Sequence, residues 1–258
     1  MNRNLQAFKQ KLAKGEYVLG PFSKTSDPAF VEASGHAGFD FIILDLEHGP
    51  NNILSLQNLI RSAEIAGILP LVRVPFETPS DISRALDIGA AGVQIPQIDS
   101  KEQVEEVLKL TKFAPCGDRG VCRFVRAAGY SSADRQVYFR ESNETLIILQ
   151  LEGKKAIDNL EEIISVPGID ILFIGPYDLS QSLGVAGQVD HPLVIAEMEK
   201  ICAKCKEKGV VVGTFTDTLA AVERWKKAGV QYLSYSVDVG LYYEACAQLV
   251  NSVAKIES

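Results

Sequence analysis

The chain has 258 residues, of which 47% are hydrophobic and 23% are charged, a composition typical of a soluble globular protein with one sizeable core. It carries 26 Lys and Arg against 33 Asp and Glu, a net charge of −7, and it has no run of basic residues. This balance argues against binding to nucleic acid or to an anionic membrane surface through bulk charge. We therefore expect small-molecule partners, with no nucleic acid and no membrane among them.

The sequence shows no targeting or membrane-spanning signal. The first residues, 1–6, are not followed by an apolar segment of the kind found in signal peptides. No apolar run approaches the roughly 18 residues that a membrane span needs. The cysteines number five, an odd count that does not suggest a disulfide framework. We expect a reducing, cytoplasmic location.

Short β-rich apolar segments alternate along the chain with segments of helical spacing. Several are continuously apolar, as in 41–44 and 146–149, which is typical of parallel strands covered on both faces. Gly38, Gly67 and Gly229 each follow a helical segment and precede a strand, as expected for the left-handed position after a helix. The expected strands are 17–22, 40–45, 70–74, 92–95, 146–152, 170–175, 210–215 and 231–236.

Repeated β–α units in a chain of this length favour a TIM-type (β/α)8 barrel over an open doubly wound sheet. An open sheet that binds a dinucleotide would carry Gly-x-Gly-x-x-Gly after a strand, and the sequence has no such motif. We expect residues 1–258 to form a single (β/α)8 barrel domain. In such a barrel the active site lies at the carboxyl-terminal ends of the strands.

The ends of four expected strands carry polar residues. Asp45, Glu47 and His48 follow the second strand. Arg73 ends the third, where a charge must be paired because it lies at the inner end of a barrel strand. Each residue alone has an ordinary structural explanation, such as helix capping, but their coincidence at one rim favours an active site. The fifth and sixth strands add Gln150, Glu152, Pro176, Tyr177 and Asp178.

Six segments in chain order carry a family resemblance. They are Asp-Leu-Glu-His-Gly-Pro at 45–50, Leu-Val-Arg-Val-Pro at 71–75, Arg-Ala-Leu-Asp-Ile-Gly at 84–89, Pro-x-Gly-x-Arg-Gly at 115–120, Gln-Leu-Glu at 150–152 and Phe-Ile-Gly-Pro-Tyr-Asp-Leu-Ser at 173–180. Together they resemble the HpcH/HpaI family of metal-dependent 2-keto-3-deoxy acid aldolases, over nearly the whole chain. The resemblance implies a class II aldolase on a (β/α)8 barrel, which cleaves or forms 4-hydroxy-2-keto acids through a metal-stabilised pyruvate enolate. It also implies a homo-oligomer in which the last helix is exchanged between two subunits and dimers assemble into hexamers.

The resemblance assigns a role to each matching residue. Glu152 and Asp178 match the metal-binding carboxylates. Arg73 matches the arginine that contacts the keto oxygen of pyruvate, and His48 matches the catalytic base. Asp87 matches a carboxylate that partners this histidine, in the same or a neighbouring subunit. The residues that match the pyruvate site are Arg73, Gln150, Gly175, Pro176, Tyr177 and Asp178.

Two positions depart from the family pattern. Leu46 stands where the family usually has Gly, and Tyr177 stands where many members have Ala. Both positions are near the expected substrate. They leave the identity of the aldehyde open.

The proposed chemistry explains these residue types. Cleavage of a 4-hydroxy-2-keto acid leaves an enolate whose oxygen carries charge, and a divalent cation spreads that charge as a Lewis acid. Two carboxylates plus water suit Mg²⁺ or Mn²⁺, with Co²⁺ possible. Arg73 adds a fixed positive charge at the same oxygen. His48 is suited to take the C4 hydroxyl proton in cleavage or the pyruvate methyl proton in condensation.

Several lysine, cysteine and arginine residues allow other interpretations. Lys154 or Lys155 could offer a Schiff-base amine, although we expect both to begin a helix and to face solvent. Cys202 and Cys205 form a redox or zinc half-motif without a second pair, and we expect ordinary helix residues. Arg119 and Arg123 either clamp a distal carboxylate or make a subunit contact. The alternative functions are a citrate-synthase-like condensing enzyme on the same barrel and, from another class, a non-catalytic barrel that binds a keto acid.

Overall fold

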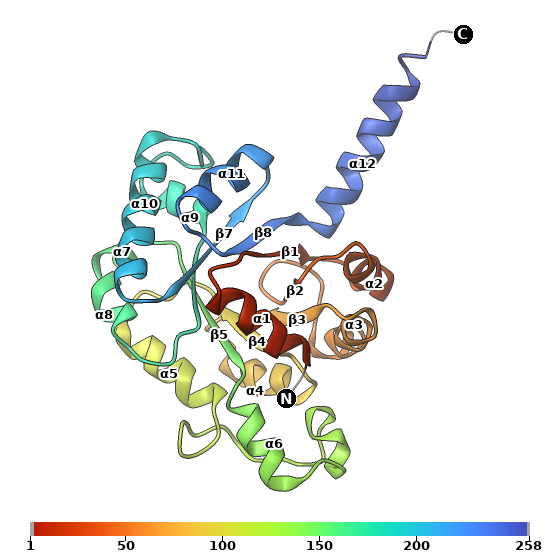
Figure 1. The fold of residues 1–258 in the computed structure, drawn as a ribbon, viewed down its shortest axis with the longest axis vertical. Helices are drawn as coiled ribbons and strands as arrows, with labels where there is room; N and C mark the ends of the chain where they lie inside the picture. Colours follow the sequence, from red (N-terminus) through yellow and green to blue (C-terminus); the bar gives the residue numbers. More distant parts are fainter. Residues whose placement is uncertain (1–2, 257–258) are drawn as a thin grey trace.

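The computed structural model describes residues 3–256 as a closed barrel of parallel strands surrounded by helices (Figure 1). Neighbouring strands pair in sequence order, and the first strand also pairs with the last, so the sheet has no open edge. The (β/α)8 fold expected from the sequence is confirmed. The strands are β1 (Val18–Ser23), β2 (Phe41–Asp45), β3 (Leu69–Arg73), β4 (Gly92–Ile95), β5 (Leu146–Leu151), β6 (Ile171–Ile174), β7 (Val211–Thr216) and β8 (Tyr232–Val237).

The strand boundaries agree closely with the sequence prediction, since each end lies within about one residue of the expected one. The three glycines that were expected after helices have left-handed backbone, with φ of +97° at Gly38, +75° at Gly67 and +94° at Gly229. A side chain is strained in this conformation, and glycine therefore ends the helix at low cost before the next strand begins.

Most helices run back along the outside of the barrel, and α1 closes its amino-terminal end. Leu5 and Phe8 of α1 are buried with the side chains that fill the barrel interior. None of the described helices is long and apolar enough to cross a membrane. The helices are α1 (Arg3–Ala13), α2 (Pro28–His36), α3 (Ile53–Ala66), α4 (Pro79–Asp87), α5 (Lys101–Thr111), the 3-10 helix η1 (Arg126–Ser131), α6 (Arg135–Ser142), α7 (Lys154–Asp158), α8 (Leu160–Ile164), α9 (Pro176–Ser182), α10 (Pro192–Glu207), α11 (Leu219–Lys227) and α12 (Asp238–Val253).

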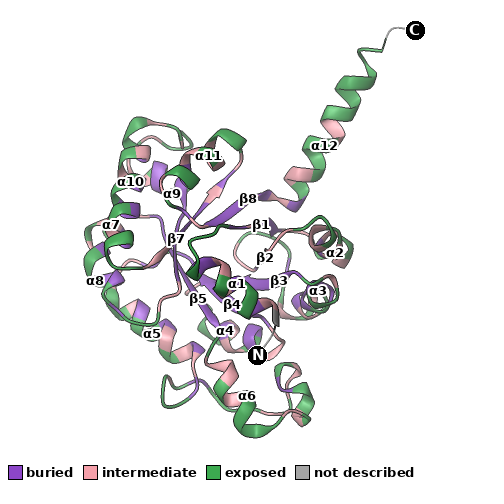
Figure 2. Ribbon diagram, in the orientation of Figure 1, coloured by how far each residue is buried: buried purple, intermediate pink, exposed green. Residues whose placement is uncertain are grey.

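Each strand is buried on both faces, which explains the continuous apolar segments (Figure 2). In β2, Ile42 and Leu44 pack in the layer between the strands and the helices. Phe41 and Ile43 point the other way, into the barrel interior. Because side chains alternate along a strand, the next inward position is Asp45, at the carboxyl-terminal end. The apolar interior is therefore followed by a polar layer at this rim.

The last helix, α12, extends away from the barrel after β8 (Figures 1 and 2). Its side chains are largely exposed although several are apolar. Tyr242, Leu249 and Val250 are 62%, 65% and 67% exposed. An apolar helix face of this kind, left uncovered in the single chain, is typical of a surface that meets another protein.

Candidate active site

The inward positions at the carboxyl-terminal rim carry polar side chains from neighbouring strands. Asp45 ends β2 and Arg73 ends β3, and the two residues are register partners in the sheet. Gln94 of β4 and Gln150 of β5 occupy the equivalent inward positions, and both are buried. Strand alternation thus brings together residues that are far apart in the sequence.

Arg73 is held by two carboxylates. Its Nε donates to Asp45 Oδ1 at 2.8 Å, and its terminal nitrogen Nη2 donates to Asp45 Oδ2 at 2.6 Å. The other terminal nitrogen lies 2.8 Å from Glu47 Oε2. Asp45 is fully buried and Arg73 is 6% exposed. The pairing expected for a buried strand-end arginine is therefore present, and it fixes the orientation of the guanidinium group.

Lys24 is a further cation of this rim, and the sequence analysis missed it. Its ammonium group pairs with Asp45 Oδ2, and its side chain lines the same cavity as Arg73. Lys24 directly follows β1, so the strand-end rule applied to the first strand would have found it. The expected first strand, 17–22, ends one residue earlier than β1.

His48 lies at the edge of this network. Its Nε2 atom is 3.8 Å from Glu47 Oε2, and its side chain is 69% exposed. The backbone N–H groups of Glu47 and His48 both donate to Asp45 Oδ1. Asp45 therefore holds Arg73 directly and also fixes the loop that carries His48.

Glu152 is a buried carboxylate that directly follows β5. One oxygen accepts a hydrogen bond from the backbone N–H of Gln97 at 3.0 Å, and the other accepts from Gln150 Nε2 at 2.6 Å. The side-chain oxygen of Gln150, Oε1, in turn accepts a hydrogen bond from Gln94 Nε2 at 2.6 Å. Glu152 is 8% exposed. The chain of amides fixes both Glu152 and Gln150 at the rim.

Gly175 allows the loop after β6 to approach Glu152. A Cβ atom at this position would lie 2.8 Å from Glu152 Oε2 and 3.2 Å from Glu152 Cβ. Both distances are too short for an ordinary carbon contact. Glycine is therefore required by close approach, and not by its backbone angle, which is in the extended region.

A cavity of about 200 Å³ opens at this rim. The predicted site residues Arg73, Gln150, Gly175, Pro176, Tyr177 and Asp178 all line it. It is also bounded by Phe22, Lys24, Phe173, Phe215 and Val237. The structure thus brings together the residues that the sequence analysis placed at the pyruvate site.

The charges at the rim are not balanced among the named residues. Burial alone would raise the pKa of Asp45, but the Arg73 and Lys24 charges outweigh it and hold that pKa below its usual value. Burial also raises the pKa of Glu47, and Arg73 only partly opposes this effect. Burial raises the pKa of Glu152 to about 7, and the charges of Asp178 and Glu47 add to the shift. Lys24 and Arg73 thus form ion pairs with Asp45 and Glu47 and not with Glu152 or Asp178, although the charge of Glu152 also acts on Arg73.

This unpaired charge bears on metal binding. No group of three or more His, Cys, Asp or Glu side chains suited to hold a metal occurs among residues 3–256. The available donors are the carboxylates of Glu152 and Asp178, which repel each other. Two carboxylates fit a hard cation such as Mg²⁺, which commonly takes one or two protein carboxylates and completes its shell with water and substrate oxygens.

Asp87 is not at this rim. It ends α4, which runs back from the carboxyl-terminal end of β3 to the amino-terminal end of the barrel. Its carboxylate accepts a hydrogen bond from Arg119 at 2.5 Å. Within one chain Asp87 is therefore paired with Arg119 and lies at the other end of the barrel from His48. Its expected partnership with His48 stays a prediction, and it requires a neighbouring subunit.

The lysines and cysteines that suggested other chemistry do not line the rim cavity. Lys154 begins α7 and Lys155 pairs with Asp99 at 2.9 Å, and both lysines are exposed and absent from the cavity lining. Cys202 and Cys205 are buried free thiols on α10, and burial raises their pKa values to about 11 and about 12. Such thiols are poor nucleophiles and poor metal ligands at neutral pH.

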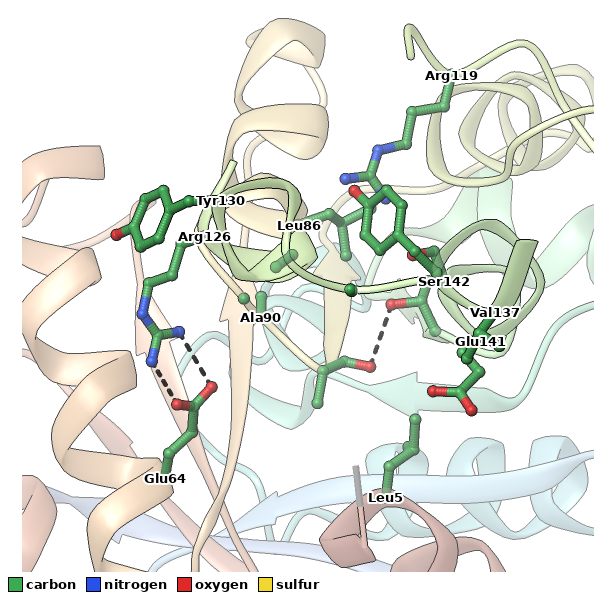
Figure 3. Close-up of a pocket in the computed structure, with 16 residues that line it drawn as sticks. Leu5, Glu64, Leu86, Ala90, Arg119, Arg126, Tyr130, Val137, Glu141 and Ser142 are labelled. Carbon is green, nitrogen blue, oxygen red and sulfur yellow. Dashed lines mark hydrogen bonds and ion pairs between the residues drawn. The ribbon is translucent and has the colours of Figure 1, made fainter. Parts of the chain in front are cut away.

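A larger pocket, of about 480 Å³, lies at the amino-terminal end of the barrel (Figure 3). Figure 3 shows Arg126 facing Glu64, with which it forms two hydrogen bonds. Arg119, at the top of the same view, is already engaged by Asp87. Both arginines are thus neutralised by carboxylates of the chain. Size alone does not identify the site, because active sites of this fold lie at the opposite end.

Comparison with known proteins identifies the family of the chain. The family model described as HpcH/HpaI aldolase/citrate lyase matches residues 19–245. The chain is 31% identical to the hydroxypyruvate/pyruvate aldolase of Roseobacter denitrificans, over 92% of this chain and 93% of that protein. It is 33% identical to the 5-keto-4-deoxy-D-glucarate aldolase of Shigella boydii, over 96% of each chain.

Solved structures show the same relationship. The structure of an HpcH/HpaI aldolase/citrate lyase family protein from Burkholderia cenocepacia J2315 has a TM-score of 0.91 and 33% identity, covering 96% of this chain and 99% of that one. The structure of the citrate synthase SbnG has a TM-score of 0.85 and 30% identity, covering 96% and 97% of the two chains. The same barrel thus occurs in relatives described by different condensation and cleavage reactions.

Proposed function

The chain belongs to the HpcH/HpaI aldolase/citrate lyase family and is a carbon–carbon lyase, and we propose that it is a divalent-metal-dependent aldolase that interconverts a 4-hydroxy-2-keto acid with pyruvate and an aldehyde. The observation that carries this proposal is the buried Arg73 guanidinium, fixed by Asp45 and Glu47 at the wall of the rim cavity. A rigid, permanently charged donor of this kind suits the enolate oxygen that forms when the carbon–carbon bond breaks.

The other residues of the rim divide the remaining tasks. His48 takes the proton of the C4 hydroxyl group in cleavage and returns it in condensation, and its exposure leaves room for water to relay the proton. Gln150 lines the cavity beside the keto acid. The backbone from Gly175 to Asp178 holds the carboxylate of pyruvate. Gly175 allows this backbone to lie close to Glu152.

Glu152 and Asp178 would hold the cation, with Mg²⁺ or Mn²⁺ favoured and Co²⁺ possible. The mutual repulsion of the two carboxylates supports this assignment, since a bound divalent ion would compensate both charges. When bound, the ion supplies a Lewis acid for the keto and carboxylate oxygens of the substrate.

A second candidate function is a citrate-synthase-like condensation. It is favoured by one observation, the similarity to the citrate synthase SbnG over nearly the full length of both chains. The two functions differ in both reactants: the aldolase joins a pyruvate enolate to an aldehyde, whereas the synthase joins the enolate of an acetyl thioester to oxaloacetate and releases the thiol. Pyruvate release from 4-hydroxy-2-keto acids in a coupled assay would support the aldolase, whereas citrate formation from oxaloacetate and an acetyl thioester, without pyruvate release, would support the synthase.

We also propose that the protein is a homo-oligomer in which α12 packs against a second subunit. The apolar side chains of α12 support this proposal, because most of their surface is exposed in the single chain, although Tyr242 contacts Phe30. An assembly through α12, as trimers of dimers, should appear as a hexamer in analytical ultracentrifugation. Removal of residues 238–258 should then abolish it.

The exchange of the pyruvate methyl protons in deuterated water tests the proposed aldolase, because it requires enolate formation but no aldehyde. Exchange followed by NMR should occur with Mg²⁺, Mn²⁺ or Co²⁺, stop with EDTA, and return when metal is restored. Arg73→Lys should exchange poorly, because a flexible ammonium group keeps the charge but loses the paired donors. Rapid exchange in EDTA-treated protein would contradict metal dependence.

Two further measurements separate metal from Schiff-base chemistry. Calorimetry should show much weaker Mn²⁺ binding in Glu152→Ala and Asp178→Ala, and unchanged binding in Glu105→Ala, whose carboxylate is on the exposed surface of α5. Borohydride with pyruvate should trap no adduct. A trapped adduct at Lys24, the lysine that lines the cavity, would overturn the class II assignment.

A further inference from the structure

One wall of the rim cavity is aromatic. We define the aromatic wall as Phe22, Phe173, Phe215 and Tyr177, all of which line the cavity. Their rings form a connected series of contacts, with centroids 6.3 Å apart for Phe22 and Phe173, 6.1 Å for Phe22 and Phe215, and 6.0 Å for Phe215 and Tyr177. Rings packed in this way support each other and form a firm apolar surface.

The aromatic wall meets the polar residues at Phe22. The Arg73 guanidinium lies over this ring, 4.7 Å from its centroid. The ring contacts continue from Phe22 through Phe215 to Tyr177, which is the most exposed of the four rings. A substrate whose keto acid lies at Arg73 would therefore extend its other end along Phe215 and Tyr177.

Tyr177, in the first turn of α9, meets Asp217, in the loop after β7, at the mouth of the cavity. Tyr177 follows β6 and Asp217 follows β7, and the Tyr177 hydroxyl donates a hydrogen bond to Asp217 Oδ2. Asp217, together with burial, raises the pKa of Tyr177 to about 12, so the phenol keeps its proton at neutral pH. Tyr177 is 44% exposed although it also lines the cavity. Its ring therefore stands between the cavity and solvent.

The space behind this pair is small. The cavity has a volume of about 200 Å³, and at about 30 Å³ per water molecule it holds about seven water-sized groups. A pyruvate unit fills most of this space. The far substituent of the acceptor aldehyde must therefore lie against Tyr177 and Phe215 or pass the pair.

The charge beside Tyr177 is negative. Asp217 accepts the Tyr177 hydrogen bond, and Asp190 also acts on Tyr177 through its charge. Asp190 is paired with Arg224, whereas Asp217 accepts its hydrogen bond from the neutral hydroxyl group of Tyr177. A carboxylate at the far end of an acceptor would approach Asp217 and be repelled. An apolar chain would pack on the rings instead.

We propose that the hydrogen-bonded pair of Tyr177 and Asp217 is a specificity latch, which selects short acceptor aldehydes without a terminal carboxylate. This inference rests on the aldolase function proposed above and names the class of its second substrate. The Tyr177 ring sets the length limit, and the Asp217 carboxylate excludes anionic acceptors. Neither side chain has an assigned role in enolate formation, and Tyr177 contributes to the pyruvate site only through its backbone.

The test compares three acceptors in the aldol addition of pyruvate: propanal, hexanal and 4-oxobutanoate. The measured quantities are ratios of kcat/KM within one variant, which do not depend on how much enolate that variant forms. Wild type should prefer propanal to both others. Tyr177→Ala should raise the hexanal-to-propanal ratio by about tenfold or more. Tyr177→Phe keeps the ring but loses the hydrogen bond, and it should raise the same ratio by a smaller factor.

Asp217→Asn separates charge from length. The asparagine keeps an oxygen that accepts from the Tyr177 hydroxyl, so the hexanal-to-propanal ratio should stay as in wild type. The 4-oxobutanoate-to-propanal ratio should rise by about tenfold, because the repelling charge is gone. Leu219→Ala, an exposed position that begins α11 close to Asp217, is the control and should change neither ratio.

The failure of the latch can be told apart from the failure of the aldolase. If wild-type protein with metal does not exchange the pyruvate methyl protons, the proposed function fails. If exchange occurs but no aldehyde of the three reacts, the acceptor class is wrong. If the aldehydes react but Tyr177→Ala, Tyr177→Phe and Asp217→Asn keep wild-type ratios, the latch is refuted.

Discussion

Asp45 is predicted to be the residue on which both the stability and the activity of the rim depend. It is fully buried and accepts hydrogen bonds from Arg73 at 2.6 and 2.8 Å, from Lys24, and from the backbone of Glu47 and His48. Replacement by asparagine keeps the shape but turns one acceptor oxygen into a donor NH₂ group. That group would face the donors of Arg73 or Lys24, and a buried arginine would lose half of its compensating charge.

The size of the effect follows from burial. Removing one partner of a buried ion pair costs about 3–5 kcal/mol. Arg73 retains its contact with Glu47 at 2.8 Å, so we expect the lower end, about 3 kcal/mol of unfolding free energy for Asp45→Asn. The same displacement of Arg73 should lower pyruvate proton exchange by about 10²-fold, since misplacement of a catalytic group by about an ångström has this effect.

Asp40→Asn is the matched control. Asp40 immediately precedes the same strand, β2, at its other end, where it pairs with the half-exposed Lys11 and accepts a hydrogen bond from the backbone N–H of Leu19, which an asparagine oxygen can keep. A pair of this exposure contributes about 0–1 kcal/mol, and the variant should exchange pyruvate protons like wild type. Urea unfolding and NMR exchange measure both effects. If Asp45→Asn lost no more stability than Asp40→Asn, the buried network would not be what orders the rim.

Three further predictions concern the same rim. Gly175→Ala should displace Glu152, whose oxygen would lie 2.8 Å from the new Cβ, and should weaken Mn²⁺ binding in calorimetry by about tenfold or more, whereas Gly153→Ala, with open space around it, should bind Mn²⁺ normally. His48→Ala should lower kcat by about 10²–10⁴-fold with little change in pyruvate affinity, and His191→Ala, at the start of α10, should have no such effect; an unchanged kcat would remove His48 from proton transfer. Because Arg73 and Lys24 hold the pKa of Asp45 below its unfolded value of about 3.9, its contribution is complete above about pH 4 and is lost as the pH falls through the lower folded pKa. The difference in unfolding free energy between wild type and Asp45→Asn should therefore shrink as the pH falls below about 4; a difference that does not shrink there would show that the Asp45 charge is not its source.

The fold could be predicted because two local rules agree along the whole chain. Continuous apolar strands indicate burial on both faces, and glycine after each of three helices marks where the next strand begins. The position of Arg73 at an inner strand end also predicted that it would be paired. Its partners could not be chosen from sequence, because Asp45 and Glu47 approach Arg73 only through the pairing of β2 with β3.

The position of Asp87 follows from the direction of its helix. A helix that follows a barrel strand runs back toward the amino-terminal end, so its last residue lies far from the rim. This direction places any contact of Asp87 with a rim histidine in a second subunit.

The contact between Tyr177 and Asp217 lies beyond such rules. Adjacent strands predict adjacent loops, and β6 does pair with β7. Whether two side chains on those loops meet depends on a few ångströms of loop geometry and on the support of Phe215. The residues nearest the enolate are fixed by strand alternation and can therefore be predicted from the sequence. Tyr177 and Asp217, which we assign to the second substrate, lie beyond the strand ends. Their hydrogen bond at the mouth of the cavity appears only in the folded structure.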